Sequence, residues 1–455
     1  MSSLISSFQS PDKSGLPQAA RPLPVAYDWA IRITILAMLG AMFYHIIWGE
    51  IVDPMLDSIE EFGWSWSLIQ AGYLWAVVGL VLIGVRTLLW MQYRPFPHAT
   101  LDDAPSMTVI IPAYNEGAMV ANTIDSVASA RYPRDRLEIF VVDDGSKDDT
   151  WQHIQVAAQR YPGLVTALQF PKNRGKRAAL EAGFRRGRGD IAVTIDSDSI
   201  IDRDTLLAMA GPFRNARIGA VAGKVSVLNR FKGFLPRMVH VRFVLTFDML
   251  RAVQSMYGTV YCTPGALSAY RMSVVRKVLD AWVNQRFLGV SCTIGEDRAL
   301  TNWTLKEGFD VVYQRTAVVH TLMPTTYGRL CKMLLRWDRS YIREELRFAG
   351  IMWRRPLLSL PIVVMDFLVN NLRFPITYMS LATLVVLVIS EPTMILRVLI
   401  AIGVMSLFYM LYYLRSERSF EFIYGVFWSY FAFFTLFWIF PYALVTARAR
   451  GWMTR

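Results

Sequence analysis

Cysteine and charge are both scarce in this 455-residue chain. The three cysteines, Cys262, Cys292 and Cys331, form no C-x-x-C pair and are too few for a disulfide framework. We therefore exclude a disulfide-rich secreted scaffold and expect reduced thiols on the cytoplasmic side. Only 18% of the residues are charged, which is low for a soluble protein of this length.

The first 27 residues also lack the order of a secretory signal, which is a basic stretch followed by an apolar one. The stretch "MSSLISSFQSPDKSGLPQAARPLP" is polar and contains proline. We expect a short disordered cytoplasmic tail over residues 1–27 and no cleaved signal peptide.

Apolar residues, in contrast, make up 54% of the chain, with 14 Trp and 26 Phe. Part of the protein should therefore lie in a lipid bilayer. The net charge of +12 would suit nucleic acid, an anionic membrane face or a phosphorylated small molecule. We expect no nucleic acid, because no basic face interleaved with aromatic residues is left over once a membrane and a nucleotide site are assigned.

Two apolar stretches near the N-terminus, residues 28–48 and 66–90, are long enough for helices that cross a bilayer. The link at 49–63 contains no Lys or Arg, whereas a long basic region follows the second stretch. By the positive-inside rule, the link is external and both flanks are cytoplasmic. We therefore predict two transmembrane helices over residues 28–92 of a multi-pass protein of the inner (plasma) membrane.

From residue 93 to 350 the texture is that of a soluble α/β domain. Val/Ile-rich runs at 107–114, 137–144 and 191–198 each end in polar residues, and segments of helical period separate them. Such runs predict buried parallel strands. Open α/β sheets place their ligands at the carboxyl ends of such strands, so we expect the site there.

Apolar segments return after residue 350. Residues 351–373 contain Pro361 and Asp366 and predict an interfacial helix, and 374–414 predict a tight pair of transmembrane helices. The remaining residues, 415–455, predict an interfacial helix and a terminal loop. A fifth span is the alternative, but it would carry the three arginines of "ARARGWMTR" outside, against the charge bias.

Acidic residues close the first two predicted strands. Glu116, in "IPAYNEG", could accept hydrogen bonds from a base or a ribose. Asp143 and Asp144, in "VVDDGS", lie where uracil and ribose would be held. The alternative for the second motif is a solvated turn, because D-D-G is common in turns by propensity alone.

The third strand ends in "TIDSDS". Alternate side chains of a strand share a face, so Asp196 and Asp198 would point together and offer two carboxylates to Mg²⁺ or Mn²⁺. Such an ion would offset the charge of a diphosphate leaving group. The alternative is an exposed acidic strand end without a metal.

A basic run, "FPKNRGKRAAL", precedes a predicted helix. Lys172, Arg174, Lys176 and Arg177, together with the free N–H groups of that helix, could hold a diphosphate. A solvated basic face is the alternative.

The sequence "IGEDR" places two acids at the start of another predicted helix. A carboxylate beside an arginine and close to apolar residues can be held ionised and oriented to take a proton from a hydroxyl. We assign that role of general base to Asp297, with Glu296 and Arg298 as its setting. An ordinary pair of helix-capping acids is the alternative.

Residues 332–347, "KMLLRWDRSYIREELR", predict a basic amphipathic helix. Trp337 could stack on a sugar ring, and Arg336 could reach a diphosphate. A membrane-surface helix is a second interpretation, compatible with the first.

Taken together, these motifs resemble membrane-embedded family 2 glycosyltransferases, in the branch of hyaluronan synthases and nodulation-type chitin-oligosaccharide synthases. The motifs that carry the likeness are "IPAYNE", "DDGS", "GKRAAL", "DSDS", "CTPGALSAYR", "GEDRALT", "RW" and a terminal "GWMTR". The resemblance spans about 30 to 455. It implies a GT-A fold, that is, a Rossmann-like α/β domain that binds a nucleotide-sugar, inserted between transmembrane helices and accompanied by amphipathic interfacial helices.

The resemblance also implies roles for individual residues. Cys262 is similar to a position on the acceptor path, Asp297 to the family base, and Asp198 to the metal ligand of a D-x-D pair. The residues that the likeness places around the donor are Tyr114, Glu116, Asp144, Lys176, Asp196, Arg336, Trp452, Thr454 and Arg455, the last three resembling a "WGTR" loop that closes over nucleotide.

Two positions depart from the family pattern. Met333 replaces the Gln of "QxxRW", which removes an amide that could bond the acceptor, and Met453 replaces the Gly of "WGTR". Met333 therefore puts in question the retention of the polymer end, whereas Met453 makes the terminal loop bulkier and less permissive in φ.

The implied activity is polymerisation of cytoplasmic UDP-sugars with inversion, and passage of the polysaccharide through the lipid bilayer. A hyaluronan- or chitin-like product with N-acetylglucosamine is the leading expectation. A β-glucan or uronate polymer, or a non-processive transfer to a lipid carrier, is the alternative, and a catalytically silent transport subunit is a further one. The sequence leaves open whether the chain works as an oligomer or with an export partner.

Overall fold

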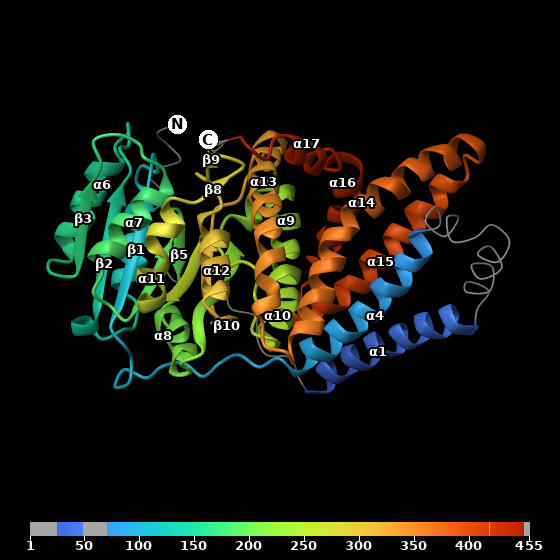
Figure 1. Ribbon diagram of the computed structural model, residues 1–455, viewed down its shortest axis with the longest axis horizontal. Coiled ribbons are helices and arrows are strands. Elements are labelled where there is room, and N and C mark those ends of the chain that lie inside the picture. The colour runs from blue at the N-terminus through green and yellow to red at the C-terminus, as the bar shows by residue number, and fades with distance from the viewer. Residues whose placement is uncertain (1–24, 49–70, 418, 450–455) are drawn as a thin grey trace. The chain divides into compact units, whose positions relative to one another are not determined.

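The computed structural model describes residues 25–48, 71–417 and 419–449 (Figure 1). Contacts divide the described chain into two compact units. The α/β unit contains residues 94–355 and 435–449, and the helical unit contains 25–93 and 356–434, within the described residues.

The α/β unit is built on one mixed sheet of eight strands. Their order is β3 (Val165–Gln169), β2 (Leu137–Asp143), β1 (Met107–Ala113), β4 (Ile191–Ile195), β7 (Leu267–Arg271), β6 (Ile218–Val227), β10 (Asp310–Thr321) and β5 (Ser199–Ile201). The three strands predicted from sequence are β1, β2 and β4, and their parallel pairing is confirmed. The sequence did not indicate β7, which runs antiparallel between β4 and β6.

Close packing of helices on this sheet explains its apolar composition. All seven residues of β1 are buried, and helix α7 (Lys176–Arg186) packs on β1 and β2. Gly183 allows this approach, because a Cβ there would lie 2.5 Å from Cγ2 of Ile110. The ring of Phe184, a residue of α7, packs edge to face against the rings of Tyr270 and Trp282. These contacts fix the first residue of α7, Lys176, at the carboxyl edge of the sheet.

Three further helices of the α/β unit pack one against the next. Helix α11 (Met272–Val283) contacts α7 and α12 (Glu296–Lys306), and α12 contacts α13 (Tyr327–Ile351). The predicted amphipathic helix 332–347 lies within α13. Helix α13 contacts α12 and α17 (Ile439–Val445), and many of its apolar side chains are buried. Its interpretation as a membrane-surface helix stays a prediction.

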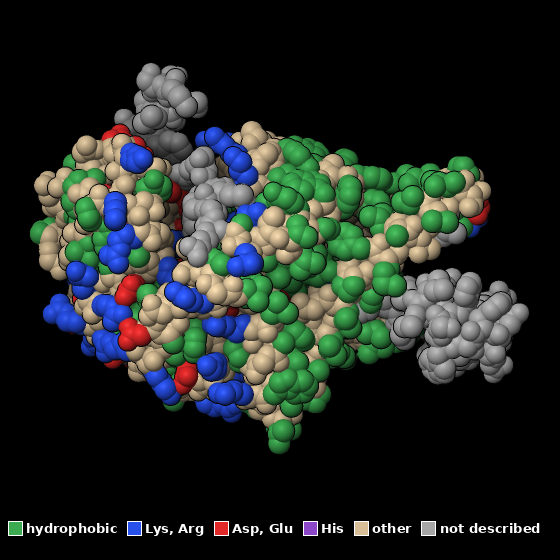
Figure 2. Space-filling view, turned by 45° about the horizontal axis from the view of Figure 1, so that its top comes forward, with side chains coloured by type: hydrophobic (Ala, Val, Ile, Leu, Met, Phe, Trp, Pro, Cys, Tyr) green, Lys and Arg blue, Asp and Glu red, His purple; other side chains and the backbone are tan. Residues whose placement is uncertain are grey.

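The helical unit contains α1 (Val25–Trp48), α4 (Ala71–Gln92), α14 (Leu360–Ser390), α15 (Met394–Ser416) and α16 (Phe422–Thr435). Polar contacts join them: the partly buried Asp28 of α1 pairs with Arg415 of α15 at 2.6 Å, and the buried Thr87 of α4 lies 2.6 Å from the Tyr412 hydroxyl of α15. Figure 2 shows hydrophobic side chains covering these helices, whereas Lys and Arg gather over the α/β unit.

Three described helices are long and apolar enough to cross a membrane: Ala26–His45, Leu360–Ser390 and Met394–Ser416. They overlap the first predicted span and the predicted pair at 374–414, but the helix Leu360–Ser390 begins 14 residues before that pair. The second predicted span, 66–90, corresponds to α4, of which Val77–Gln92 qualifies only as a shorter apolar helix. Residues 66–70 lie outside the described part of the chain.

The predicted boundary between an interfacial helix ending at 373 and a spanning helix starting at 374 is wrong. Residues 360–390 form one continuous helix, α14. Pro361 is its second residue, where the missing N–H would have no partner anyway. Asp366 is buried in an ion pair with Arg86 of α4, so its charge does not interrupt the helix. Between 421 and 446 the structure has two helices, α16 and α17. They are long and apolar enough to cross a membrane only if both together form one bent span.

Candidate active site

Two loops at the carboxyl edge of the sheet are tied to each other by hydrogen bonds. The amides of Glu116 and Gly117 both donate to Thr150 Oγ1 at 2.8 Å. The amide of Asn115, which has a φ of 53°, donates to Ser146 Oγ at 3.0 Å. Tyr114 and Glu116 therefore stand on a fixed turn after β1, and both are partly exposed.

Asp143 and Asp144 have their carboxylates engaged inside the protein. Asp143 is fully buried and accepts from the Gln169 amide group at 3.1 Å. Asp144, 3% exposed, accepts from the backbone amides of Arg174 and Gly175 at 2.7 and 2.8 Å. Burial raises the pKa of Asp144, although these two amides oppose the shift. Asp144 thus shapes the loop before Lys176, and nucleotide contacts by the two acids stay predictions.

The basic run divides between the surface and the interior. Lys172 and Arg174 are exposed, and the Arg174 guanidinium lies over the Phe170 ring. Arg177 instead is 6% exposed and donates to the Trp282 carbonyl at 2.6 Å. Its predicted contact with a diphosphate is therefore wrong in this structure, because it is the second residue of α7 and its side chain turns into the core.

Lys176 is held between two carboxylates that are distant in sequence. Its Nζ donates to Asp196 Oδ1 at 2.5 Å and lies 2.9 Å from Glu296 Oε1. Burial by itself would lower the pKa of the ammonium group, but the two carboxylates raise it above its ordinary value. The lysine is therefore a fixed positive charge at the edge of the sheet.

Glu296 and Asp297 begin α12, and Gly295 makes their position possible. Gly295 has a φ of +77°, and a Cβ there would lie 2.4 Å from the Cβ of Ser340 in α13. Only glycine fits this close approach without strain. The first turn of α12 therefore lies directly against α13, with Glu296 buried and Asp297 partly exposed.

The two adjacent acids have opposite pKa shifts. Burial favours the neutral form of Glu296, but Lys176 outweighs it and the pKa of Glu296 is lowered. Burial and then the neighbouring charge of Glu296 raise the pKa of Asp297. The lowered pKa of Glu296 beside the raised pKa of Asp297 is the pairing expected of a structural charge next to a general base.

The setting of Asp297 differs from the predicted one in one respect. The Arg298 side chain pairs with Glu345 of α13 at 2.7 Å and stacks on the Tyr341 ring, although its charge still opposes the raised pKa of Asp297. Asp297 instead accepts from the Arg298 amide at 2.7 Å and from the Gly265 amide at 3.1 Å. Because Arg298 is on the following position of a helix, its side chain points to a different neighbour.

Gly265 is the point on which these groups converge. A Cβ at this position would lie 2.9 Å from Lys176 Nζ and 3.6 Å from both Asp196 Oδ2 and Asp297 Oδ2. Three charged side chains from three segments therefore meet around a backbone without a side chain, and Glu296 joins them through its ion pair with Lys176. Sequence reasoning quoted the "CTPGAL" motif but did not assign Gly265; the signal available was a glycine directly after proline and before a buried strand.

Asp198 has different neighbours from Asp196. Both lie in the turn after β4 rather than in a strand, so the alternation argument that placed them on one face is wrong. Asp198 Oδ1 accepts from the hydroxyls of Thr321 at 3.1 Å and Ser199 at 3.3 Å. Asp196 contacts Lys176, and the predicted metal role of Asp198 stays a prediction.

Cys262 and Arg251 lie near Asp297. Cys262 Sγ is 3.9 Å from Asp297 Oδ2, and burial raises the pKa of this thiol to about 11, so it is neutral at pH 7. Arg251, at the end of a π-helix over Leu245–Arg251, donates to the Cys262 carbonyl. Sequence reasoning missed Arg251, since no motif marks a buried arginine 11 residues upstream.

Helix α13 brings the predicted Arg336 and Trp337 to the same region. The charge of Arg336 contributes to the lowered pKa of Glu296. The Trp337 ring lies 6.2 Å from the Phe243 ring. Three residues after Arg336, the Arg339 guanidinium donates to Thr446 Oγ1 at 2.9 and 3.0 Å. The chain thus leaves α17 beside α13, but Trp452, Thr454 and Arg455 lie outside the described residues.

Comparison with known proteins identifies the family of the chain. Residues 104–340 match the family described as glycosyltransferase like family 2. An N-acetylglucosaminyltransferase of Rhizobium meliloti is 30% identical over 84% of this chain and 90% of its own length. A hyaluronan synthase of Streptococcus pyogenes is 31% identical over 68% of this chain and 73% of its own. An N-acetylglucosaminyltransferase of Mesorhizobium japonicum is 36% identical, but there the match spans 57% of the relative's length and 53% of this chain.

A solved structure has the same fold. The mannosyltransferase PcManGT from Pyrobaculum calidifontis, in complex with GDP-Man and Mn²⁺, superposes with a TM-score of 0.57 over 77% of this chain and 96% of its own, at 19% identity. This likeness concerns the fold, and it confirms the expected GT-A architecture. Together with the family match, it leads to one conclusion: the chain belongs to glycosyltransferase family 2 and is an enzyme that transfers sugars.

Proposed function

We propose that this chain is a processive, inverting β-glycosyltransferase that polymerises UDP-sugars, N-acetylglucosamine among them, and passes the polysaccharide across the membrane. The observation that carries the proposal is the convergence of Lys176, Asp196 and Asp297 around Gly265, with Glu296 paired to Lys176. Relatives named as N-acetylglucosaminyltransferase and hyaluronan synthase, matched over most of the chain, favour an amino sugar in the product.

The chemistry requires a base and a stabilised leaving group. Asp297, with a raised pKa and a partly exposed carboxylate, accepts the proton of the acceptor hydroxyl as its oxygen attacks the anomeric carbon. The bond from that carbon to the diphosphate oxygen breaks on the opposite face, which inverts the configuration, and UDP leaves with the electron pair. Lys176 faces the negative charge that develops on the diphosphate, and Glu296 keeps the lysine protonated.

The donor atoms present fit a divalent cation. Asp196 and Asp198 offer carboxylate oxygens in the turn after β4, and such oxygens are the ligands that Mg²⁺ and Mn²⁺ prefer. Their partial exposure leaves them accessible from the carboxyl edge of the sheet. A bound ion would supply positive charge to the diphosphate of the donor. The Mn²⁺ and GDP-Man of the similar mannosyltransferase structure support this assignment.

The proposed location is the inner (plasma) membrane, with several spans and the α/β unit in the cytoplasm. Support comes from the apolar helices of the helical unit and from the absence of Lys and Arg in the link at 49–63. The three arginines after Val445 are then best placed on the same cytoplasmic side as the α/β unit, to which α17 belongs.

The test is Asp297→Asn in the full-length protein, purified in detergent and supplied with single and paired UDP-sugars. We expect loss of polymer and of UDP release, by at least about 100-fold as for other general bases, while UDP still binds. Asp280→Asn is the matched control, because the same chemical change there affects a side chain that is 80% exposed. Polymerisation by Asp297→Asn at the wild-type rate would reject the assignment of the base.

Product length settles processivity in the same assay. With UDP-sugar in large excess over enzyme and no added acceptor, a processive enzyme yields long chains from the earliest time points. Linkage-specific hydrolases then identify the sugars and linkages of the product. Short products that grow together with time would instead favour the non-processive alternative.

A further inference from the structure

A cavity of about 270 Å³ lies in the α/β unit between α13 and the short hairpin of β8 (Arg286–Phe287) and β9 (Val290–Ser291). None of the residues that line it belongs to the candidate active site. Its walls combine three arginines with apolar side chains: Arg286, Arg343, Arg347, Phe287, Leu288 and Leu346. The mixture of guanidinium groups and apolar surface is what needs an explanation.

The charges in this cavity are not balanced by its lining. The only carboxylate among the lining residues is that of Glu344. Its oxygens already accept from the side-chain amides of Gln285 at 2.5 Å and Asn302 at 3.0 Å. Three guanidinium groups therefore face one acid whose oxygens hold other donors, and the lining has a net charge of two positive.

Two of these guanidinium groups have buried N–H groups with no acceptor among the described residues. Arg343 is 5% exposed; its Nη2 donates to the Ile294 carbonyl at 2.8 Å, but its Nε has no partner. The Nη1 of Arg347 is likewise buried and unpartnered, although the group stacks on Trp303. A buried donor without an acceptor is costly, and burial lowers the pKa of Arg343. An anion with several oxygens would satisfy both groups.

We propose that this cavity is a binding site for a phosphoryl group. Guanidinium groups match phosphate oxygens in a planar, paired arrangement that an ammonium group does not offer. Leu288 and Leu346, which are 68% and 63% exposed, provide an apolar rim for the rest of the ligand. The volume is just below the roughly 300–1,000 Å³ of sites for drug-sized ligands, so it fits a headgroup or a small phosphorylated molecule.

The phosphoryl site adjoins the segment that leads to Glu296 and Asp297. Arg343 holds the carbonyl of Ile294, and the next residues are Gly295, Glu296 and Asp297. Glu344 in turn holds both the hairpin, through Gln285, and α12, through Asn302. A ligand on Arg343 therefore acts on a group that positions the start of α12.

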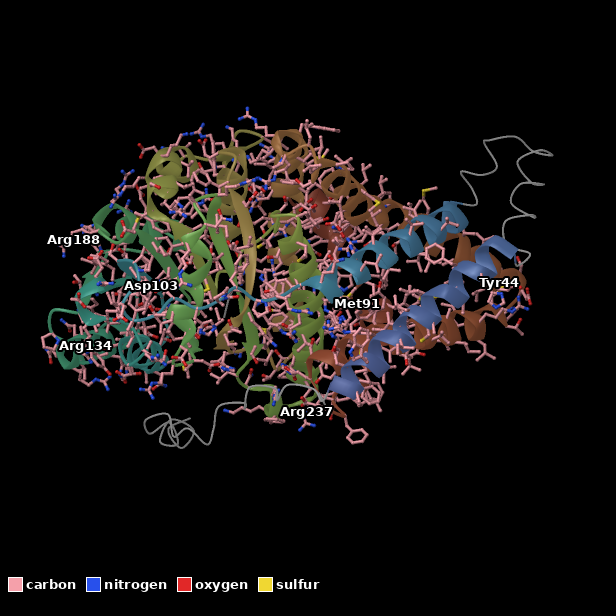
Figure 3. All side chains as sticks on the ribbon, turned by 90° about the horizontal axis from the view of Figure 1, so that it is seen from below. Tyr44, Met91, Asp103, Arg134, Arg188 and Arg237 are labelled. Carbon is pink, nitrogen blue, oxygen red and sulfur yellow. The ribbon has the colours of Figure 1, made fainter. Side chains whose placement is uncertain are left out.

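Binding can be measured on the full-length protein in detergent by titrating inorganic phosphate at constant ionic strength, with chloride as the reference salt. We expect Arg286→Gln and Arg347→Gln each to weaken phosphate binding about tenfold or more, since each removes a charged hydrogen-bond donor. Arg188→Gln is the matched control: it makes the same change of charge on a side chain that is 89% exposed, at the edge of the α/β unit (Figure 3).

A further variant distinguishes loss of the site from misfolding of the protein. Leu288→Glu places a carboxylate at the exposed rim, where it should occupy the guanidinium groups and abolish phosphate binding without lowering the melting temperature of the unliganded protein. Dioctanoyl phosphatidic acid distinguishes the two sources of the phosphoryl group: tighter binding than phosphate identifies a lipid headgroup, and equal binding identifies a small phosphorylated molecule. No saturable phosphate binding, or binding that these three variants leave unchanged, would overturn the proposal.

Discussion

Replacing Gly265 by alanine is the most direct perturbation of the proposed catalytic centre. The added methyl group would lie 2.9 Å from Lys176 Nζ and 3.6 Å from Asp196 Oδ2 and Asp297 Oδ2. The first distance is too short, so something must move. The closest atom is the end of a flexible side chain, which makes displacement of Lys176 cheaper than displacement of the backbone. The backbone of Gly265 is not in the left-handed region, so alanine introduces no strain of its own.

The size of the effect follows from the contacts that Lys176 would lose. A hydrogen bond to a charged group contributes about 1.5–3 kcal/mol. If one such contact to the transition state is lost, kcat/KM falls about 10- to 150-fold, at about 1.4 kcal/mol for each factor of ten. Stability should also fall, because displacement of Lys176 weakens its ion pairs with Asp196 and Glu296, although no backbone hydrogen bond is broken.

The assay compares initial rates of UDP release with the melting temperature of the same preparation. Gly328→Ala in the first turn of α13 is the matched control, since a Cβ there meets nothing within 4 Å; it should retain full activity. If Gly265→Ala kept wild-type kcat/KM with an unchanged melting curve, the convergence of charges on Gly265 would not be the place where the sugar is transferred.

Three further predictions follow from the same geometry. The raised pKa of Asp297 means that the base becomes protonated at a higher pH than an ordinary aspartate, so kcat/KM should fall early on the acid side. Glu296→Gln removes the neighbouring negative charge and should move that acid limb to lower pH; a pH–rate profile that does not move would contradict the pairing. Gly295→Ala should destabilise the protein by about 2–5 kcal/mol, from left-handed backbone strain and the clash with Ser340, and an unchanged melting temperature would contradict this close packing. EDTA should stop turnover and Mg²⁺ or Mn²⁺ restore it; activity without metal would remove the role proposed for Asp198.

Local pattern was enough for the elements that frame the site. β1, β2 and β4 are runs rich in buried Val and Ile. Such continuous apolar runs are removed from water only in a sheet that is covered on both faces. α15 was likewise evident from length and hydropathy. The grouping of acids and a lysine at the ends of these strands follows, because parallel strands end at one edge.

Partners of individual side chains were not predictable in the same way. Arg298 could pair with either of two acids, Asp297 next to it in the chain or Glu345, which is 47 residues away. Only the packing of α12 on α13 selects Glu345. Pro361 and Asp366 looked like interruptions, yet Arg86, 280 residues from Asp366, neutralises the acid and α14 continues.

What the sequence alone determined is which chemical groups the protein carries and at which strand and helix ends they stand, since composition and period are local properties. The tertiary structure decided that Asp196 and Glu296 clamp Lys176, that Gly265 leaves the space between them, and that Asp297 is the more basic of two adjacent acids. Those outcomes depend on burial and on charges brought together from distant segments, and the free energy of a carboxylate is set by these surroundings rather than by its neighbours in the chain.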